Sequence, residues 1–215
     1  MNNKECFSKQ MPKLIIICSI IIAAISTYIL LNNDLSNKPL AGQGGAIEDS
    51  ALIGGDFILT DQNGNKFNSE KMQDRITLIY FGFTYCPDVC PTSLQKMNVI
   101  VESLHKYKID VLPIFISVDP KRDTPDVLKK YLSHFNKNII GLTGDEATIK
   151  EVADLYKVYY EFAHSPEELD GGTYMIDHTS FLYLMGKNRQ YVKHFYLTDS
   201  AEDVIEYIRV NHKSF

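Results

Sequence analysis

The most constraining feature of the chain is a buried-strand pattern that leads directly into a pair of cysteines. Residues 76–83 form a near-continuous apolar run, and Cys86 and Cys90 follow it closely. Pro91, which the first turn of a helix tolerates, comes next, and apolar residues then recur three and four positions apart. We therefore expect both thiols at a strand-to-helix turn, where the positive end of the helix dipole favours thiolate over thiol.

The spacing of the two cysteines leaves three kinds of chemistry open. Cys-x3-Cys lies within the range of soft-metal ligand spacings and is one residue longer than the Cys-x2-Cys typical of thiol oxidoreductases. At i and i+4 the two sulfurs can lie on one side of a first helical turn, within reach of a disulfide or of a shared metal ion. Spacing alone is equally compatible with metal binding, redox exchange and an inert disulfide. A metal site would need a third ligand.

An uncharged stretch near the N-terminus predicts a transmembrane anchor. Residues 14–31 carry no charge, and a helix of this length, at about 1.5 Å per residue, spans about 27 Å, close to the hydrocarbon thickness of a bilayer. Lys4, Lys9 and Lys13 precede it, so the positive-inside bias assigns residues 1–13 to the cytoplasm and the domain after the anchor to the outer side. The run is long for a signal peptide and no Ala-x-Ala follows, which favours an uncleaved anchor.

This topology separates the four cysteines. Cys6 and Cys18 belong to the cytoplasmic end and the anchor, and Ile17 is not the small residue that lipoprotein processing at Cys18 requires. Only Cys86 and Cys90 reach the oxidising outer side. The lack of an Arg-rich transit segment favours a single-pass protein of the bacterial inner membrane, with its C-terminal domain in the periplasm.

The rest of the chain divides into a linker and one domain. Residues 32–52 are rich in Asn, Gly, Ser and Lys and are expected to form the linker, and residues 53–215 the domain. With 45% hydrophobic and 23% charged residues, the chain has the composition of a protein with a substantial core. A formal net charge of -5 without any basic cluster argues against nucleic acid as a partner.

Hydrophobic periodicity predicts alternating strands and helices in this domain. Thr124, Asp145 and Ser200 are suited to cap helices. The order is that of an α/β thioredoxin-like fold, a central mixed sheet flanked by helices, preceded here by the N-terminal transmembrane helix. Strands are expected at residues 57–61, 66–67, 76–83, 111–118, 139–142, 174–176, 181–185 and 191–195, and helices at residues 91–104, 125–135, 146–156 and 201–211.

Of the six histidines, His178 is the one that this fold would bring to the thiols. It follows Asp177 at the entrance to the strand at residues 181–185, and in a thioredoxin-like sheet that loop packs against the helix N-terminus that carries the cysteines. Its location sets His178 apart, although a lone histidine is more often structural than a ligand. Asp177 is a candidate to orient the His178 ring or, equally, to satisfy backbone groups in its loop.

Three motifs together resemble the SCO/SenC family. They are FGFTYCPDVCP at residues 81–91, SVDPKRDTP at residues 117–125 and DHT at residues 177–179. Members of this family are membrane-anchored, thioredoxin-like copper proteins that help to assemble the CuA centre of cytochrome c oxidase. The resemblance extends from about Gly54 to Asn211, and it implies that Cys86, Cys90 and His178 are copper ligands.

The resemblance implies a copper metallochaperone that is loaded by an upstream donor and delivers copper to the CuA centre of cytochrome c oxidase subunit II. Two thiolates and one imidazole form a soft set that suits Cu(I) and also holds Cu(II), whereas structural zinc prefers four ligands. The open coordination position would let a partner's thiolate take the metal. The loop Asp119–Thr124 follows a strand's C-terminal end and is expected either to contact partners or to form only a turn.

The rival hypothesis is an enzyme, a thiol–disulfide oxidoreductase that reduces the cysteines of the CuA site before metallation. Thioredoxins carry a cis-proline that faces their cysteine pair, whereas residues 177–180 read Asp-His-Thr-Ser, which favours metal ligation. Redox chemistry at Cys86 and Cys90 can accompany copper binding, because loading requires the reduced pair. A peroxidase ranks lower, since no peroxidatic Thr-x-x-Cys precedes the pair.

Overall fold

The computed structural model describes residues 19, 21–28, 53–163 and 174–215. The chain forms two units, residues 1–45 and 46–215. In the first unit, residues 21–28 are helical. Within the described ranges, no helix is both long enough and apolar enough to cross a bilayer. Half of the predicted anchor at residues 14–31, and all of the cytoplasmic segment 1–13 and the linker 32–52, lie outside the described residues.

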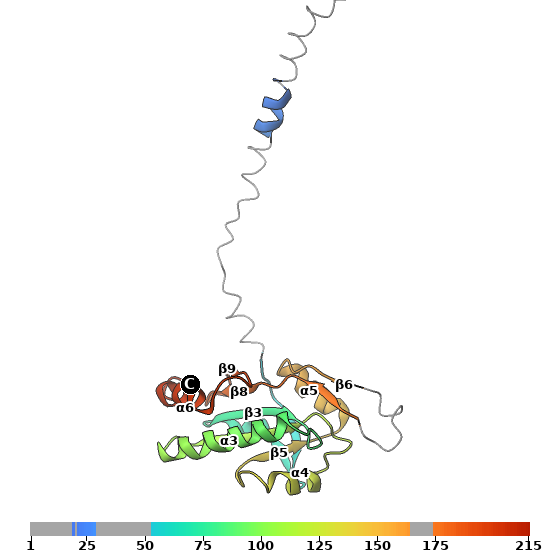
Figure 1. Ribbon diagram of the computed structural model, residues 1–215, viewed down its shortest axis with the longest axis vertical. Coiled ribbons are helices and arrows are strands. Elements are labelled where there is room, and N and C mark those ends of the chain that lie inside the picture. The colour runs from blue at the N-terminus through green and yellow to red at the C-terminus, as the bar shows by residue number, and fades with distance from the viewer. Residues whose placement is uncertain (1–18, 20, 29–52, 164–173) are drawn as a thin grey trace, which may run out of the picture. The chain divides into compact units, whose positions relative to one another are not determined.

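A seven-stranded mixed sheet forms the centre of the second unit, in the strand order β2-β1-β5-β4-β3-β8-β9 (Figure 1). The three middle strands β5, β4 and β3 are parallel, and the remaining pairs are antiparallel. All seven strands were expected from the sequence to within about two residues at either end. Their bounds are β1 Ile58–Asp61, β2 Lys66–Asn68, β3 Ile76–Gly82, β4 Val111–Ser117, β5 Ile140–Thr143, β8 Leu182–Met185 and β9 Tyr191–Phe195.

A separate two-stranded sheet pairs β6 (Tyr160–Phe162) with β7 (Ile176–His178). The sequence pattern did not predict β6, and it placed the strand before His178 at residues 174–176, two residues too early. Antiparallel pairing of Tyr160 with His178 sets the register and makes His178 the last residue of the strand. His178 is therefore held by strand hydrogen bonding and does not lie in a loop.

The described part of the second unit also contains four helices and one 3-10 turn. The predicted caps are confirmed, because Thr124, Asp145 and Ser200 each accept a backbone N–H of the helix that follows. One helix is shorter than expected: α4 ends at Leu132 because i to i+3 hydrogen bonds follow it, as far as the N–H of Phe135. The bounds are η1 Ser69–Met72, α3 Val89–Lys106, α4 Pro125–Leu132, α5 Glu146–Leu155 and α6 Ala201–Asn211.

The two faces of the sheet are covered by different helices. Along β3 successive side chains point to opposite faces. On one face the ring of Tyr80 packs against Phe115, which in turn contacts Tyr131 of α4. On the other, Phe81 contacts Tyr156 at the end of α5. Figure 1 shows α3 and α4 on one side of the sheet and α5 on the other. The turn after β3 lies at the edge of the sheet, between these helices.

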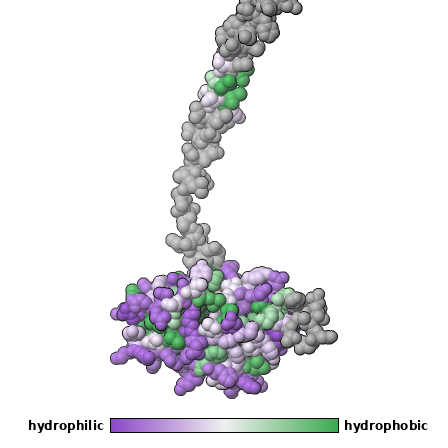
Figure 2. Space-filling view, in the orientation of Figure 1, coloured by the Kyte–Doolittle hydropathy of each residue, from purple (hydrophilic) through white to green (hydrophobic). Residues whose placement is uncertain are grey.

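The central strands are the most deeply buried part of the domain. All residues of β3 and β4 are buried, as their near-continuous apolar runs predicted. On the face in Figure 2 the surface is mainly hydrophilic, with small apolar areas scattered over it. The core is therefore formed on both sides of these strands.

Candidate metal centre

The turn between β3 and α3 brings the two cysteines together. The N–H of Cys86 donates to the carbonyl of Phe83 at 3.3 Å, which folds the chain back after the strand. The N–H of Cys90 donates to the Cys86 Sγ at 3.4 Å. Cys86 is half-buried, Cys90 is fully buried, and both are free thiols. Cys86 precedes α3, which begins at Val89, and the i, i+4 spacing brings its sulfur to the N–H of Cys90 in the first turn.

His178 reaches the same place from β7. Its Nε2 lies 3.7 Å from the Cys90 Sγ. Its Nδ1 lies 3.1 Å from the carbonyl of Thr179. A carbonyl can only accept, so Nδ1 carries the proton and the lone pair of Nε2 faces the sulfur. The edge-on rings of Phe83 and Tyr80, at 5.8 and 6.2 Å between centroids, hold the imidazole in this orientation.

Asp177 does not orient the His178 ring. Asp177 lies on the exposed face of β7, whereas His178, the next residue along the strand, points inward. The carbonyl of Thr179 takes the orienting role instead. The first of the two roles considered for Asp177 is therefore wrong, and a backbone acceptor one residue beyond the histidine replaces it.

The pKa values of the two thiols are shifted in opposite directions. The contact with the Cys90 thiol lowers the pKa of Cys86 to about 5, and backbone N–H groups of the first helical turn act in the same direction. That same contact, together with burial, raises the pKa of Cys90 far above its usual range. Burial lowers the pKa of His178, against the opposing effect of the Cys86 sulfur. At neutral pH the cluster holds a thiolate, a thiol and a neutral imidazole.

These three side chains form an open set of soft donors. Within the described residues, no three His, Cys, Asp or Glu side chains are already arranged closely enough to enclose a metal ion. Two of the three donors here, the Cys86 thiolate and the neutral His178, are in the protonation state that a metal requires, and only Cys90 would have to release a proton. The same two sulfurs are also adjacent enough for thiol–disulfide chemistry.

A buried carboxylate ties the cysteine turn to the neighbouring strand. Asp123 is fully buried and accepts hydrogen bonds from the N–H of Thr84 at 2.9 Å and from its hydroxyl at 2.5 Å. It also accepts from the hydroxyl of Ser117, the last residue of β4, at 2.6 Å. Burial raises the pKa of Asp123. Thr84 lies two residues before Cys86, so Asp123 fixes the start of the turn.

The same loop also supports the chain that leads to His178. Asp119 is buried, accepts from the hydroxyl of Tyr174 at 2.6 Å and forms an ion pair with Arg122. The guanidinium of Arg122 donates to the Tyr174 carbonyl at 2.9 Å and lies over the rings of Tyr174 and Tyr85. The Asp119–Thr124 loop therefore braces both arms of the site. This role was missed, although charged residues after a strand end had singled the loop out.

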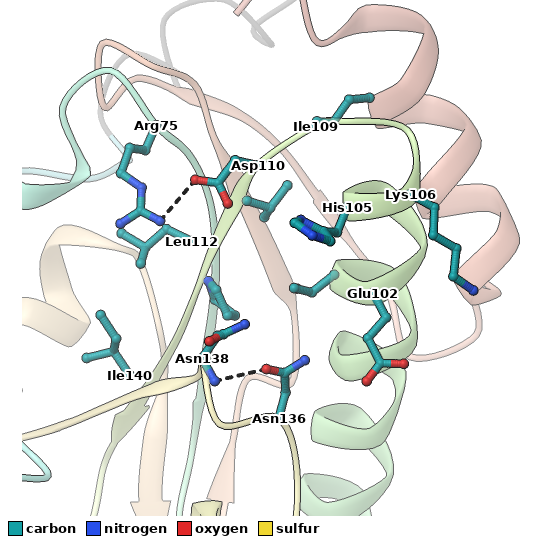
Figure 3. A pocket seen from close by; sticks show the side chains of 13 residues that line it. Arg75, Glu102, His105, Lys106, Ile109, Asp110, Leu112, Asn136, Asn138 and Ile140 are labelled. Carbon is teal, nitrogen blue, oxygen red and sulfur yellow. Dashed lines mark hydrogen bonds and ion pairs between the residues drawn. The ribbon is translucent and has the colours of Figure 1, made fainter.

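A cavity lies at the end of the sheet opposite the two thiols. Its volume is about 620 Å³, and it opens between the last turn of α3, where His105 lies, and the start of β4. Figure 3 shows the Arg75–Asp110 ion pair on one wall and Asn136 with Asn138 below it. Neither cysteine of the turn nor His178 lines this cavity, so the thiol and imidazole site is separate from it.

The fold and this site define a class: a thioredoxin-like α/β domain that holds two thiols and an imidazole at one edge of its sheet. The SCO1/SenC family model matches residues 45–212. The chain therefore belongs to the SCO1/SenC family, as the three motifs had suggested.

Individual relatives agree with this assignment. The SCO2-like protein of Rickettsia conorii is 53% identical over 197 residues, which cover 92% of this chain and 95% of the relative. The solved structure of Bradyrhizobium japonicum ScoI with copper bound has a TM-score of 0.66 and 41% identity, covering 74% of this chain and 98% of that one. BsSco, a member of the Sco family of cytochrome c oxidase assembly proteins, has a TM-score of 0.59 and 26% identity, covering 74% and 92%. The predicted mixed α/β, thioredoxin-like fold is confirmed.

The unequal thiols predict selective alkylation. In the reduced protein, iodoacetamide should modify Cys86 with a half-maximal rate near pH 5, because its pKa is lowered to about 5, and should spare Cys90, which is buried. Mass spectrometry of the peptides reports each site, and Cys86→Ser should abolish the fast reaction. Equal rates at the two thiols, or a half-maximal rate near pH 8.5, would contradict the assignment.

The buried carboxylate predicts a large loss of stability on its removal. Asp123→Ala leaves three donor groups without an acceptor and should lower the free energy of unfolding by about 3 kcal/mol or more. Urea denaturation followed by circular dichroism measures this. The matched control is Asp126→Ala, an exposed acidic residue in α4, which should cost about 1 kcal/mol or less. Similar losses in both variants would show that Asp123 does not brace the turn.

Proposed function

We propose that this protein binds copper through Cys86, Cys90 and His178 and passes it from an upstream donor to the CuA centre of cytochrome c oxidase subunit II. The observation that carries the proposal is the Nε2 lone pair of His178, 3.7 Å from the Cys90 sulfur and oriented by the Thr179 carbonyl. Two further points support it: the ScoI relative was solved with copper bound, and BsSco belongs to a family of cytochrome c oxidase assembly proteins.

The donor set explains why copper is the metal. Two thiolates and an imidazole are soft ligands that suit Cu(I), and their number leaves the metal with an open position. Two thiolates with Cu(I) carry a net charge near -1, which the N-terminus of α3 stabilises. Because Cys86 is half-buried and Cys90 fully buried, an incoming thiolate of the partner meets the metal on the Cys86 side. Transfer is then an exchange of ligands and needs no redox step.

The location follows from the same proposal. Residues 14–31 anchor the protein in the bacterial inner membrane by a single pass, residues 1–13 stay in the cytoplasm, and residues 32–52 tether the domain 53–215 in the periplasm. The support is the uncharged stretch and the lysines before it. An anchored donor would meet a membrane-bound oxidase by diffusion in two dimensions, which raises its effective concentration.

A second candidate function is thiol–disulfide exchange, and the asymmetry of the two thiols favours it. A Cys86 thiolate can attack a disulfide of the target protein, and Cys90 can then displace the mixed disulfide. The target gains two thiols and this protein is left with a Cys86–Cys90 disulfide, so electrons balance. Reduction of the CuA-site cysteines before metallation would use the protein in this way.

Removal of the imidazole separates the two functions. The reduced domain 53–215, which corresponds to the part seen in the solved ScoI relative, is titrated with Cu(I) against a competing chelator. His178→Ala should weaken one-to-one binding by more than about 100-fold, because even changes to residues behind the ligands cost about 10- to 100-fold. His105→Ala, an exposed histidine at the far end of α3, is the matched control and should bind like the parent.

The opposite pattern would favour the enzyme. If His178→Ala binds copper as tightly as the parent, the ligand assignment is wrong. If, in addition, reduction of a disulfide substrate requires both Cys86 and Cys90, thiol–disulfide exchange becomes the better account of the site.

Gly82 predicts a second way to weaken copper binding. A Cβ at this last residue of β3 would lie 2.8 Å from the Cys90 sulfur and 3.0 Å from the Phe115 and Tyr80 rings. Gly82→Ala should therefore displace the sulfur and lower Cu(I) affinity by about 10- to 100-fold in the same titration. Gly144→Ala, which meets side chains far from the thiols, should change stability without changing copper affinity. Parent-like affinity in Gly82→Ala would contradict this reading of the close contact.

A further inference from the structure

The Cys90 sulfur has a third neighbour besides Cys86 and His178. The hydroxyl of Tyr80, which comes from the middle strand β3, lies 3.9 Å from the Cys90 Sγ. The side chain of Tyr80 is 1% exposed, and its ring lies edge-on to the ring of His178. Tyr80 therefore contacts two of the three donor side chains from the interior of the protein.

The Tyr80 hydroxyl has other polar groups within its surroundings. The hydroxyls of Ser93 and Ser180 both act on it, in opposition to the effects of burial and of Cys90, which raise its pKa. A small cavity of about 10 Å³ is lined by these side chains and by Lys96, a volume that suits about one water molecule. The hydroxyl can thus turn toward this polar pocket or toward the sulfur.

The charge on sulfur decides between these two directions. A thiol is a weak acceptor, whereas a thiolate accepts a strong, charge-assisted hydrogen bond. Because Cys90 is fully buried, no water can supply that bond from outside. The backbone of Phe83 already hydrogen-bonds this sulfur. Among the described side chains, Tyr80 is the hydroxyl in hydrogen-bond contact with it, so a metal-bound Cys90 thiolate would accept a further hydrogen bond from Tyr80.

We propose that Tyr80 is a positioning residue of the metal centre, whose hydroxyl donates to the Cys90 sulfur when copper is bound and shifts the centre toward Cu(I). The inference rests on the proposed function, since it presumes that Cys90 is a copper ligand. A hydrogen bond to a ligating thiolate withdraws electron density from sulfur, weakens its donation to Cu(II) and so raises the Cu(II)/Cu(I) potential. Tyr80 then acts on the metal through Cys90 and does not touch it.

The test removes only the hydroxyl. Full-length protein in mild detergent is loaded with copper as the parent and as Tyr80→Phe. The variant should bind Cu(I) about 10-fold more weakly. Its thiolate-to-Cu(II) charge-transfer band should move to longer wavelength and its Cu(II)/Cu(I) potential should fall, because the sulfur becomes the better electron donor.

A buried tyrosine on the neighbouring strand supplies the control. Tyr183 of β8 is 2% exposed and contacts Phe81, on the other face of the sheet from Tyr80. Tyr183→Phe should reproduce any general loss of stability while leaving the band and the potential at the parent values. A shift of equal size in Tyr183→Phe would overturn the proposal.

A third variant strengthens the bond instead of deleting it. Replacing Tyr80 with 3-fluorotyrosine keeps the side chain's shape and makes its hydroxyl a stronger donor, so the band should move to shorter wavelength. This variant decides the question even if Tyr80→Phe does not fold. Parent-like spectra in both Tyr80 variants would refute the inference, whereas failure of the parent itself to bind copper would refute the proposed function.

Discussion

The buried carboxylate of Asp123 is the interaction on which the site depends. It gathers two hydrogen bonds from Thr84 and one from Ser117, and thereby joins the turn after β3 to the end of β4. A carboxylate is costly to bury, and three donors at 2.5–2.9 Å offset that cost only while the turn keeps its shape. The electrostatic requirement of one residue therefore specifies the backbone path that carries Cys86.

The strands of the main sheet and the helix caps could be predicted, because each leaves a local mark in the sequence, whereas the meeting of Cys86, Cys90 and His178 followed from the expected fold. The strands β3 and β4 are buried on both faces and read as apolar runs, and Thr124, Asp145 and Ser200 are typical capping residues. By contrast, β6 is a three-residue strand that exists only through its pairing with β7, and nothing within Tyr160–Phe162 announces a partner 16 residues away. Short strands depend on tertiary pairing more than on propensity.

The polar residues that support the site could not be predicted from local sequence patterns either. Asp177 was an attractive candidate to orient His178 because carboxylates often take that role, yet strand alternation turns it outward and a carbonyl orients the ring. The Asp119–Thr124 loop was expected either to contact partners or to form only a turn, but Asp119 and Asp123 are both buried. Whether an acidic side chain meets water or three donors is decided by residues distant in the chain, such as Thr84 and Tyr174.

The separate β6–β7 sheet has a mechanical consequence. The turn and α3 hold the two sulfurs on the seven-stranded sheet. Among the strands that the structure describes, β7, which ends at His178, pairs with β6 alone. Within the described part of the chain, the imidazole and the thiols thus stand on two hydrogen-bonded sheets, and residues 179–181 connect β7 to β8 of the main sheet. Moving the imidazole away from the sulfurs breaks no strand pairing in the main sheet. The imidazole can therefore move away from the sulfurs, which would weaken the binding of an ion, while the core stays intact.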